Sequence, residues 1–160
     1  MAEASNPDLS EGWIQPLPMS CRREHEHSRD VPHCHASPVK VFLADDSVLI
    51  RERVAAMLGA NAMIIVGQAE TPQGSINGIL AAQPDVVVLD VQLNGGSGLQ
   101  VLRAVRQAAS AVTFVVFSNN SGPAYRKRYL KEGAVRFLDK TTEFDQLARA
   151  VVKASQHAAH

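Results

Sequence analysis

The sequence predicts a single α/β domain in which a five-stranded parallel sheet carries helices on both faces. Five short apolar runs alternate with five helical patterns between residues 39 and 156, and parallel strands need crossover connections of this kind. The run at residues 86–89 is apolar throughout, which is typical of a strand buried on both faces. A chain of 160 residues has room for one such domain, and we expect no second one.

The first strand is expected at residues 39–44, the apolar run that starts the predicted domain. Ser47 follows shortly, and serine is a good helix N-cap because its side-chain oxygen accepts a backbone N–H of the first turn. We therefore expect the next helix over residues 48–58. Gly59 is expected to end it, since glycine readily takes the left-handed conformation found at helix ends.

The second strand is expected at residues 62–66, the next apolar run. Pro72 then begins a helix, because the first helical position loses nothing when it lacks an N–H. Pro84 interrupts the chain before the third strand at residues 86–89.

Residues 94–98, Asn-Gly-Gly-Ser-Gly, lead from the third strand into the next helix. The glycines superficially resemble a dinucleotide-binding loop, but the G-x-G-x-x-G spacing is absent, so we interpret the segment as a turn. Farther along, Pro123 begins a helix and Gly133 ends one. The remaining expected elements are a helix at 99–108, a strand at 113–117, a helix at 123–132, a strand at 136–139 and a helix from 142 to about 156.

Residues 1–37 are rich in proline and polar side chains and have no helical or strand periodicity. Such a segment buries too little apolar surface to offset the entropy lost on ordering. We therefore predict a disordered N-terminal extension at 1–37 and a folded domain at 38–157. The extension contains both cysteines and four histidines, but their spacing fits no compact zinc site, and we favour a tail without a metal role.

Composition narrows the possible function classes. Sixteen basic residues balance sixteen acidic ones, and no helix-turn-helix pattern follows the domain, so nothing indicates a nucleic-acid partner. No apolar run is long enough to cross a bilayer, and no secretory leader pattern is present. We therefore expect a cytoplasmic protein that binds neither nucleic acid nor membrane.

Five side chains suited to chemistry follow the predicted strands. They are Asp45 and Asp46 after the first strand, Asp90 after the third, Ser118 after the fourth and Lys140 after the fifth. Because functional groups of a parallel sheet gather beyond the carboxyl ends of its strands, we expect these side chains to converge. Three adjacent carboxylates repel one another, and Mg²⁺ suits a site of few carboxylates plus water. One aspartate could then attack phosphorus, while the lysine and the hydroxyl share the phosphoryl oxygens.

These five residues, together with Gly98 eight positions after Asp90, resemble the two-component response regulator receiver domain. The resemblance covers residues 39 to about 156 and implies a flavodoxin-like, doubly wound (βα)5 fold. It implies a phosphoacceptor of a two-component or phosphorelay system, which takes a phosphoryl group onto Asp90 from a histidine kinase or histidine phosphotransfer protein. The chain then resembles a single-domain response regulator, which is no conventional enzyme although it catalyses its own phosphoryl transfer and autodephosphorylation.

The resemblance implies a role for each site residue. Asp46 would bind Mg²⁺ directly, and Asp45 mainly through a water molecule. Asp90 would be both a metal ligand and the phosphoacceptor, and the backbone carbonyl of Gln92 would complete the protein ligands. Lys140 would bind a phosphoryl oxygen and pair with Asp90 beforehand.

The resemblance also implies a conformational switch. Ser118 would follow the phosphate, and Phe137 would change rotamer as Ser118 moves. A downstream protein target would then bind the surface made by the fourth helix, the fifth strand and the fifth helix. A basic run on the fourth helix is usually a solvated face, but here we expect it to help dock an acidic or helical partner. The run comprises Arg126, Lys127, Arg128 and Lys131.

Three places depart from the pattern of the family. Asn94 stands where many receivers have a proline, and Thr141 stands where a proline is frequent after the lysine. Asn119 and Asn120 follow Ser118, where the family usually places a small residue. None of these changes removes a ligand, but the two asparagines should crowd or polarise the phosphate entrance and so affect the phosphate lifetime.

Two alternatives stay open. The first is a receiver-like scaffold that acts by protein contact without phosphorylation. The second is a phosphatase with an aspartate nucleophile after the first strand. That class has its two aspartates separated by one residue, whereas Asp45 and Asp46 are adjacent.

Overall fold

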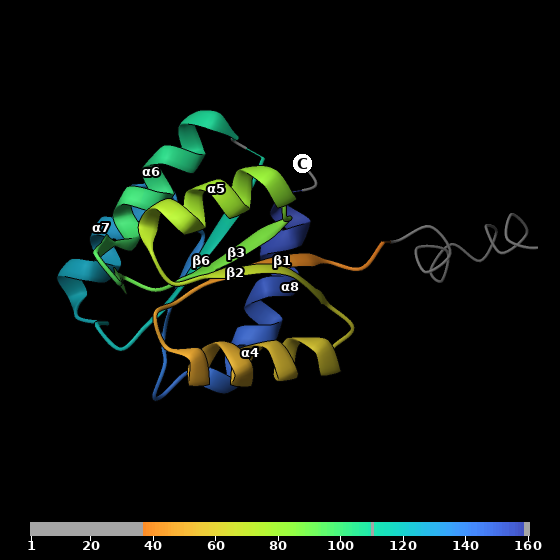
Figure 1. Ribbon diagram of the computed structural model, residues 1–160. Helices are drawn as coiled ribbons and strands as arrows, with labels where there is room; N and C mark the ends of the chain where they lie inside the picture. Colours follow the sequence, from red (N-terminus) through yellow and green to blue (C-terminus); the bar gives the residue numbers. More distant parts are fainter. Residues whose placement is uncertain (1–36, 110, 159–160) are drawn as a thin grey trace, which may run out of the picture. The chain divides into compact units, whose positions relative to one another are not determined.

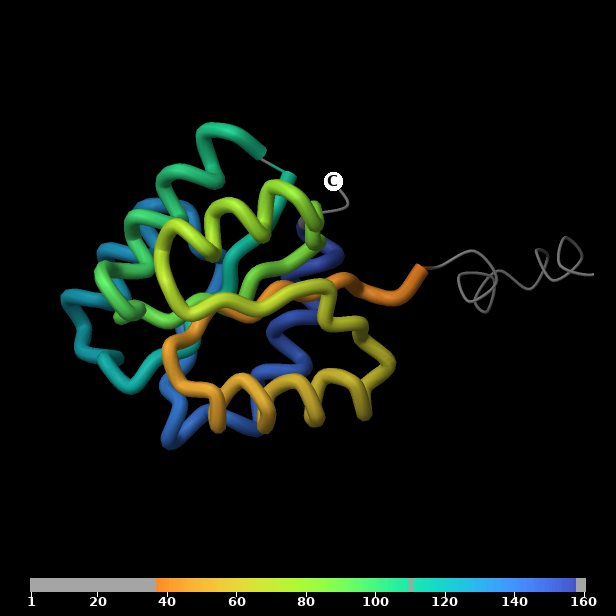
Figure 2. The backbone as a smooth tube through the Cα atoms, in the orientation of Figure 1, coloured from red at the N-terminus to blue at the C-terminus, as the bar shows by residue number. Residues whose placement is uncertain are grey.

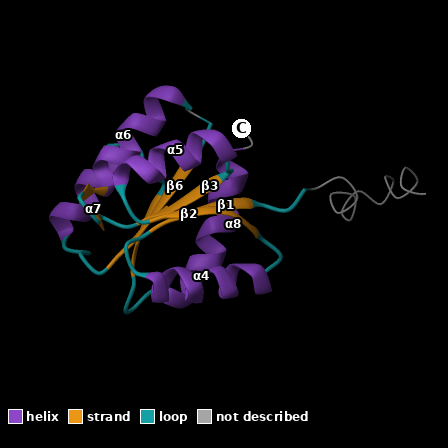
Figure 3. Ribbon diagram, in the orientation of Figure 1, coloured by secondary structure: helices purple, strands orange, loops and turns teal. Residues whose placement is uncertain are grey.

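A five-stranded parallel sheet lies at the centre of the computed structural model, which describes residues 37–109 and 111–158. The strand order is β2-β1-β3-β6-β7, and every neighbouring pair is parallel. In that order the strands are Ile64–Ala69, Lys40–Ala44, Val86–Leu89, Thr113–Ser118 and Arg136–Asp139. The predicted fold class is thereby confirmed (Figure 3). The predicted N-terminal extension lies outside the described residues, except for Ser37.

Helices cover both faces of the sheet, with α5 and α6 on one face and α4 and α8 on the other (Figure 1). Since successive strand residues point to opposite faces, the sheet contributes to two cores. Phe114 and Val116 pack with α5, α6 and α7, whereas Val115 and Phe117 pack with α4 and α8. Each of these fully buried side chains stabilises the fold by about 1.5–3 kcal/mol. The helices are α4 (Val48–Ala60), α5 (Pro72–Ala82), α6 (Gly98–Ala108), α7 (Pro123–Lys131) and α8 (Leu147–Ala158).

The N-termini of α4 and α5 lie at the residues that the sequence predicted. The Ser47 hydroxyl accepts a backbone N–H of the first turn of α4 at 3.2 Å. Thr71 caps α5 in the same way at 3.0 Å, and Pro72 is the first residue of that helix. Gly133 follows α7 with a φ of +119°, a conformation that costs glycine nothing.

The end of α4 differs from the prediction, because the helix continues past Gly59. The left-handed residue is Ala62, with a φ of +64°. The Leu58 carbonyl accepts the N–H groups of both Asn61 and Met63. The helix end is therefore satisfied by backbone groups, and no glycine is needed there.

Three further differences concern the ends of elements. The second strand was expected at residues 62–66 but runs from Ile64 to Ala69, because β2 is an edge strand whose last residues include glycine and glutamine. The last helix begins later than residue 142, since a short 3₁₀ turn, η3 (Phe144–Gln146), precedes α8. The predicted turn after β3 is present, but short strands β4 (Gln92–Leu93) and β5 (Gly96–Ser97) flank it.

In the part of the chain that the structure describes, no helix combines the length and the apolar character that a bilayer span requires.

Candidate functional site

The carboxyl ends of β1 and β3 lie at the switch point of the strand order. β2 lies on one side of β1 and β3 on the other. The connection after β1 leads to α4 on one face, whereas the connection after β3 leads to α6 on the other face (Figure 2). In an open parallel sheet such a divergence creates the crevice in which ligands bind.

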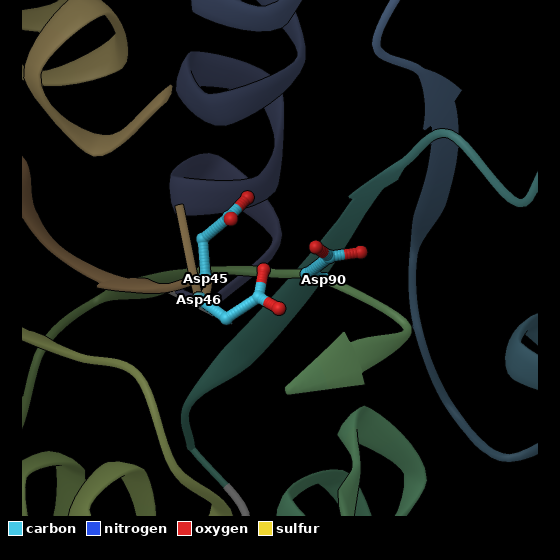
Figure 4. A group of neighbouring side chains, drawn as sticks. All are labelled: Asp45, Asp46 and Asp90. Atoms are coloured by element: carbon cyan, nitrogen blue, oxygen red, sulfur yellow. The ribbon is translucent and has the colours of Figure 1, made fainter. Parts of the chain in front are cut away.

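Three carboxylates occupy this crevice. Asp45 and Asp46 follow β1, and Asp90 follows β3. One oxygen from each of them lies within 4.8 Å of the others, and Figure 4 shows the three side chains gathered at this edge of the sheet. Asp45 and Asp90 are each only 6% exposed, whereas Asp46 is exposed. The structure thus brings the three predicted carboxylates together.

Lys140 supplies a positive charge to the cluster. Its Nζ lies 2.6 Å from Asp45 Oδ2 and 2.9 Å from Asp90 Oδ2, and its side chain is only 7% exposed. The backbone holds this position, because the Lys140 N–H donates to the carbonyl of Ser118 at the end of the neighbouring strand. One ammonium against three carboxylates leaves a formal charge of minus two.

Burial and neighbouring charged groups shift the pKa values of two members of the cluster. Burial raises the pKa of Asp45, and the charge of Asp90 adds to the rise, which outweighs the hydrogen bonds that Asp45 accepts from Lys140 and Ser47. Burial alone would lower the pKa of Lys140. The hydrogen bond to Asp45 and the charge of Asp90 overcome that effect, so the pKa of Lys140 is raised. The lysine therefore stays charged, and the remaining negative charge of the cluster favours the binding of a cation.

A cavity of about 330 Å³ opens onto the cluster. Its lining includes all the predicted metal and phosphate residues except Asp45, together with Asn119 and Asn120. Ser118 is 1% exposed, and its Oγ accepts the N–H of Asn120 at 3.1 Å. The Thr141 hydroxyl lies 3.4 Å from the side-chain oxygen of Asn119, so two of the residues that depart from the family pattern contact each other. The predicted residues in the lining are Asp46, Asp90, Gln92, Ser118 and Lys140.

The donor set fits a magnesium ion. Oxygen ligands of Mg²⁺ lie about 2.0–2.1 Å from the ion, so two direct ligands are at most roughly 4.2 Å apart. A spread of up to 4.8 Å among the three ligand oxygens suits two direct carboxylate ligands and a third that acts through water. A divalent cation would also balance the formal charge of minus two.

Gly98 lies against the backbone of Asp90. A Cβ atom on Gly98 would lie 2.1 Å from the carbonyl oxygen of Asp90, and its N–H donates to the carbonyl of Val91 at 2.7 Å. Only a glycine therefore allows the first residue of α6 to lie against the backbone of Asp90.

Phe137 does not line the cavity of the acidic cluster. Its ring is 5% exposed and packs edge-on against Tyr129, with ring centres 6.0 Å apart. The guanidinium of Arg126 lies over the ring, 5.2 Å from its centre.

Arg126 was expected to be part of a basic run that helps to dock a partner. In the structure it is partly buried, donates to the carbonyls of Ser121 and Phe137 and pairs with Glu143. Sequence reasoning missed this role because two of its partners, Phe137 and Glu143, lie 11 and 17 residues along the chain. Lys127 and Arg128 remain exposed on α7.

Comparisons with known proteins give matches over most of the chain. The family model described as response regulator receiver domain matches residues 41–152. Protein-glutamate methylesterase/protein-glutamine glutaminase of Clostridium acetobutylicum is 32% identical over 114 residues, which are 69% of this chain and 33% of that protein. The DNA-binding transcriptional activator DevR/DosR of Mycobacterium tuberculosis is 31% identical over 114 residues, which are 71% of this chain and 52% of that protein.

Among solved structures, the signal receiver domain of NarL from Mycobacterium tuberculosis matches with a TM-score of 0.70 and 30% identity, over 75% of this chain and 98% of that one. The chain spans between a third and about half of the length of the two curated relatives.

Proposed function

Since the chain belongs to the response regulator receiver domain family of two-component systems, we propose that it accepts a phosphoryl group on Asp90. The observation that carries the proposal is the surroundings of this carboxylate, which lies beside two other carboxylates and 2.9 Å from the Lys140 ammonium. Asp90 also faces a cavity, so an incoming phosphoryl group has access to it. An aspartate in such surroundings suits nucleophilic attack on phosphorus.

In the proposed step, an Oδ atom of Asp90 attacks the phosphorus of a phosphohistidine. A P–O bond forms while the P–N bond breaks, and its electron pair leaves with the imidazole nitrogen. Lys140 binds one phosphoryl oxygen, and the Ser118 hydroxyl donates to another. Water later attacks the aspartyl phosphate, which releases inorganic phosphate and restores the carboxylate of Asp90.

The proposed metal ligands are the carboxylates of Asp46 and Asp90 and the carbonyl of Gln92, with Asp45 acting through water. When bound, Mg²⁺ supplies positive charge that offsets the negative charge on the carboxylates and the phosphoryl oxygens. Lys140 contributes a second positive charge beside Asp90.

The proposed donor is a histidine kinase or a histidine phosphotransfer protein, and we place the exchange in the cytoplasm. The proposed output is contact with a target protein through the surface of α7, β7 and α8, with Phe137 and Ser118 as the switch. Lys127 and Arg128, rather than Arg126, are the basic side chains that we expect to contact an acidic partner. Methylesterase activity and DNA binding belong to the relatives named above.

The direct test is labelling with radioactive acetyl phosphate. The wild type should incorporate close to one phosphoryl group per chain in the presence of Mg²⁺ and none with excess EDTA. Asp90→Asn should not be labelled, because an amide is no nucleophile for this reaction. The label should be stable in acid and labile in base, as an acyl phosphate is.

Asp85→Asn is the matched control, because Asp85 lies at the opposite end of β3 and accepts a backbone N–H that asparagine can also bind. This variant should be labelled like the wild type. Labelling of Asp90→Asn at the wild-type level would refute the proposal. Absence of label in folded wild type would favour the scaffold that acts without phosphorylation.

A further inference from the structure

Arg126 contacts three separate segments outside its own helix. Its Nε donates to the carbonyl of Ser121 at 3.1 Å, and its two terminal nitrogens reach the carbonyl of Phe137 at 2.9 Å and Glu143 Oε1 at 3.0 Å. The same guanidinium covers the ring of Phe137. A planar guanidinium with several donors is suited to such a junction, which a lysine could not reproduce.

Glu143 links Arg126 to the segment that contains Lys140. The carboxylate oxygen that pairs with Arg126 also accepts the backbone N–H of Asp139 at 2.8 Å. The Glu143 N–H donates in return to the carbonyl of Asp139. Asp139 and Glu143, the first and last residues of segment 139–143, are therefore joined by two hydrogen bonds.

Asp139 fixes the interior of this segment. Its Oδ1 accepts the N–H groups of Thr141 and Thr142, at 2.7 and 3.0 Å. Its Oδ2 accepts the hydroxyl of Ser121, from the loop that leads into α7. These bonds lower the pKa of Asp139 to about 2, with the Ser121 hydroxyl as the largest cause. Segment 139–143 is thus held by hydrogen bonds on both sides of Lys140.

We infer that Arg126 and Glu143 are positioning residues that hold segment 139–143, and with it the Lys140 ammonium, and that couple Lys140 to α7. The consequence is that α7 responds to a phosphoryl group through these contacts, and this consequence rests on the proposed function. Lys140 reaches Asp45 and Asp90 only while segment 139–143 keeps its position. A shift of Lys140 toward a phosphoryl oxygen therefore displaces segment 139–143 and the Arg126–Glu143 pair. Because Arg126 belongs to α7 and contacts Phe137, both of these move with it.

The first test compares ligands that use Lys140 with one that does not need it. Beryllofluoride with Mg²⁺ occupies the phosphoryl position, whereas Mg²⁺ alone needs only the carboxylates. We expect Glu143→Ala to weaken beryllofluoride binding about tenfold and to change the affinity for Mg²⁺ alone by less than twofold. Glu143→Gln should lose less, because its amide oxygen still accepts the Asp139 N–H. The Arg126→Lys variant should bind beryllofluoride more tightly than the Arg126→Met variant.

The matched control is Glu132→Gln. Glu132 pairs with Arg103 at 2.9 Å and also links the end of α7 to another helix, but away from segment 139–143. This variant should bind both ligands like the wild type. Equal effects of Glu143→Ala and Glu132→Gln on beryllofluoride binding would overturn the inference, and thermal melts of each variant identify any that fail to fold.

The second test needs no phosphoryl analogue. The Nε–H signal of Arg126 in ¹⁵N nuclear magnetic resonance spectra reports on the junction directly. Lys140→Met should shift this signal and the amides of α7, whereas Lys153→Met, an exposed change on α8, should not. An unshifted Arg126 signal in Lys140→Met would overturn the coupling. A shifted signal in a protein that binds no beryllofluoride would refute the proposed function and support the positioning role.

Discussion

Replacing Lys140 with methionine should destabilise the magnesium-free protein by about 3 kcal/mol. Its ammonium lies within 2.9 Å of both Asp45 and Asp90, and each aspartate is 6% exposed. Removing one partner of a buried ion pair typically costs about 3–5 kcal/mol, because the other charge remains buried without compensation. We expect a loss of stability at the lower limit of this range, since the adjoining cavity gives water access to the carboxylates.

Asp90→Asn should have the opposite effect, although it removes a partner of the same lysine. At an effective dielectric constant of about 20, attraction across 2.9 Å is worth roughly 6 kcal/mol, and repulsion across 4.8 Å, the upper limit of the separations among the three carboxylates, is worth at least roughly 3.5 kcal/mol. Asp90 makes one such attraction, with Lys140, and two such repulsions, with Asp45 and Asp46. The balance favours the neutral side chain by about 1 kcal/mol, and the asparagine oxygen can still accept from Lys140.

The assay is urea unfolding in EDTA, followed by far-ultraviolet circular dichroism, for the wild type, both variants and the control Lys153→Met. The free energy of unfolding should fall for Lys140→Met, stay equal or rise for Asp90→Asn, and hardly change for Lys153→Met. If Lys140→Met proves as stable as Lys153→Met, or if Asp90→Asn loses as much as Lys140→Met, the electrostatic account of the cluster is wrong.

Three further predictions follow from the same structure. Mg²⁺ at 100 times its dissociation constant should stabilise the wild type by about 2.7 kcal/mol, and thermal melts should show a smaller gain for Asp90→Asn. Burial raises the pKa of Tyr129 to about 12 from 10.0. Its phenol therefore contributes stability that is complete below pH 10 and is lost as the pH rises to 12, by about 2–3 kcal/mol; unfolding titrations should show a smaller loss for Tyr129→Phe. Gly98→Ala should cost about 2 kcal/mol or more and weaken Mg²⁺ binding, because its Cβ collides with the Asp90 carbonyl; Gly122→Ala, with nothing within 4 Å, should be neutral or stabilising by up to about 1 kcal/mol.

The elements that the sequence predicted well are those with a physical signal of their own. Strand β3 (Val86–Leu89) is apolar throughout because both of its faces are buried, so its bounds were predicted correctly. The meeting of Asp45, Asp46 and Asp90 follows from parallel topology alone. The edge strand β2 and the end of α4 were less predictable, because an edge strand tolerates polar residues and backbone bonds ended the helix where a glycine was expected.

The junction around Arg126 illustrates what sequence patterns leave out. A basic run such as Arg126, Lys127, Arg128 and Lys131 is usually a solvated face, and three of these four residues are exposed. Arg126 differs because β7 and the segment that follows it bring Phe137 and Glu143 beside α7, and no periodicity predicts that contact. The turn at Asp139 carried a weaker signal, since an aspartate often accepts the N–H groups of the residues that follow it.

The most direct measurement of the central claim is a crystal structure of the protein with Mg²⁺ and beryllofluoride. We expect one magnesium ion, bound by the carboxylates of Asp46 and Asp90 and the carbonyl of Gln92. The beryllium should be attached to Asp90, and its fluorine atoms should lie within hydrogen-bonding distance of Lys140 and Ser118. An ion bound elsewhere, or a lysine ammonium directed away from the occupied aspartate, would contradict it.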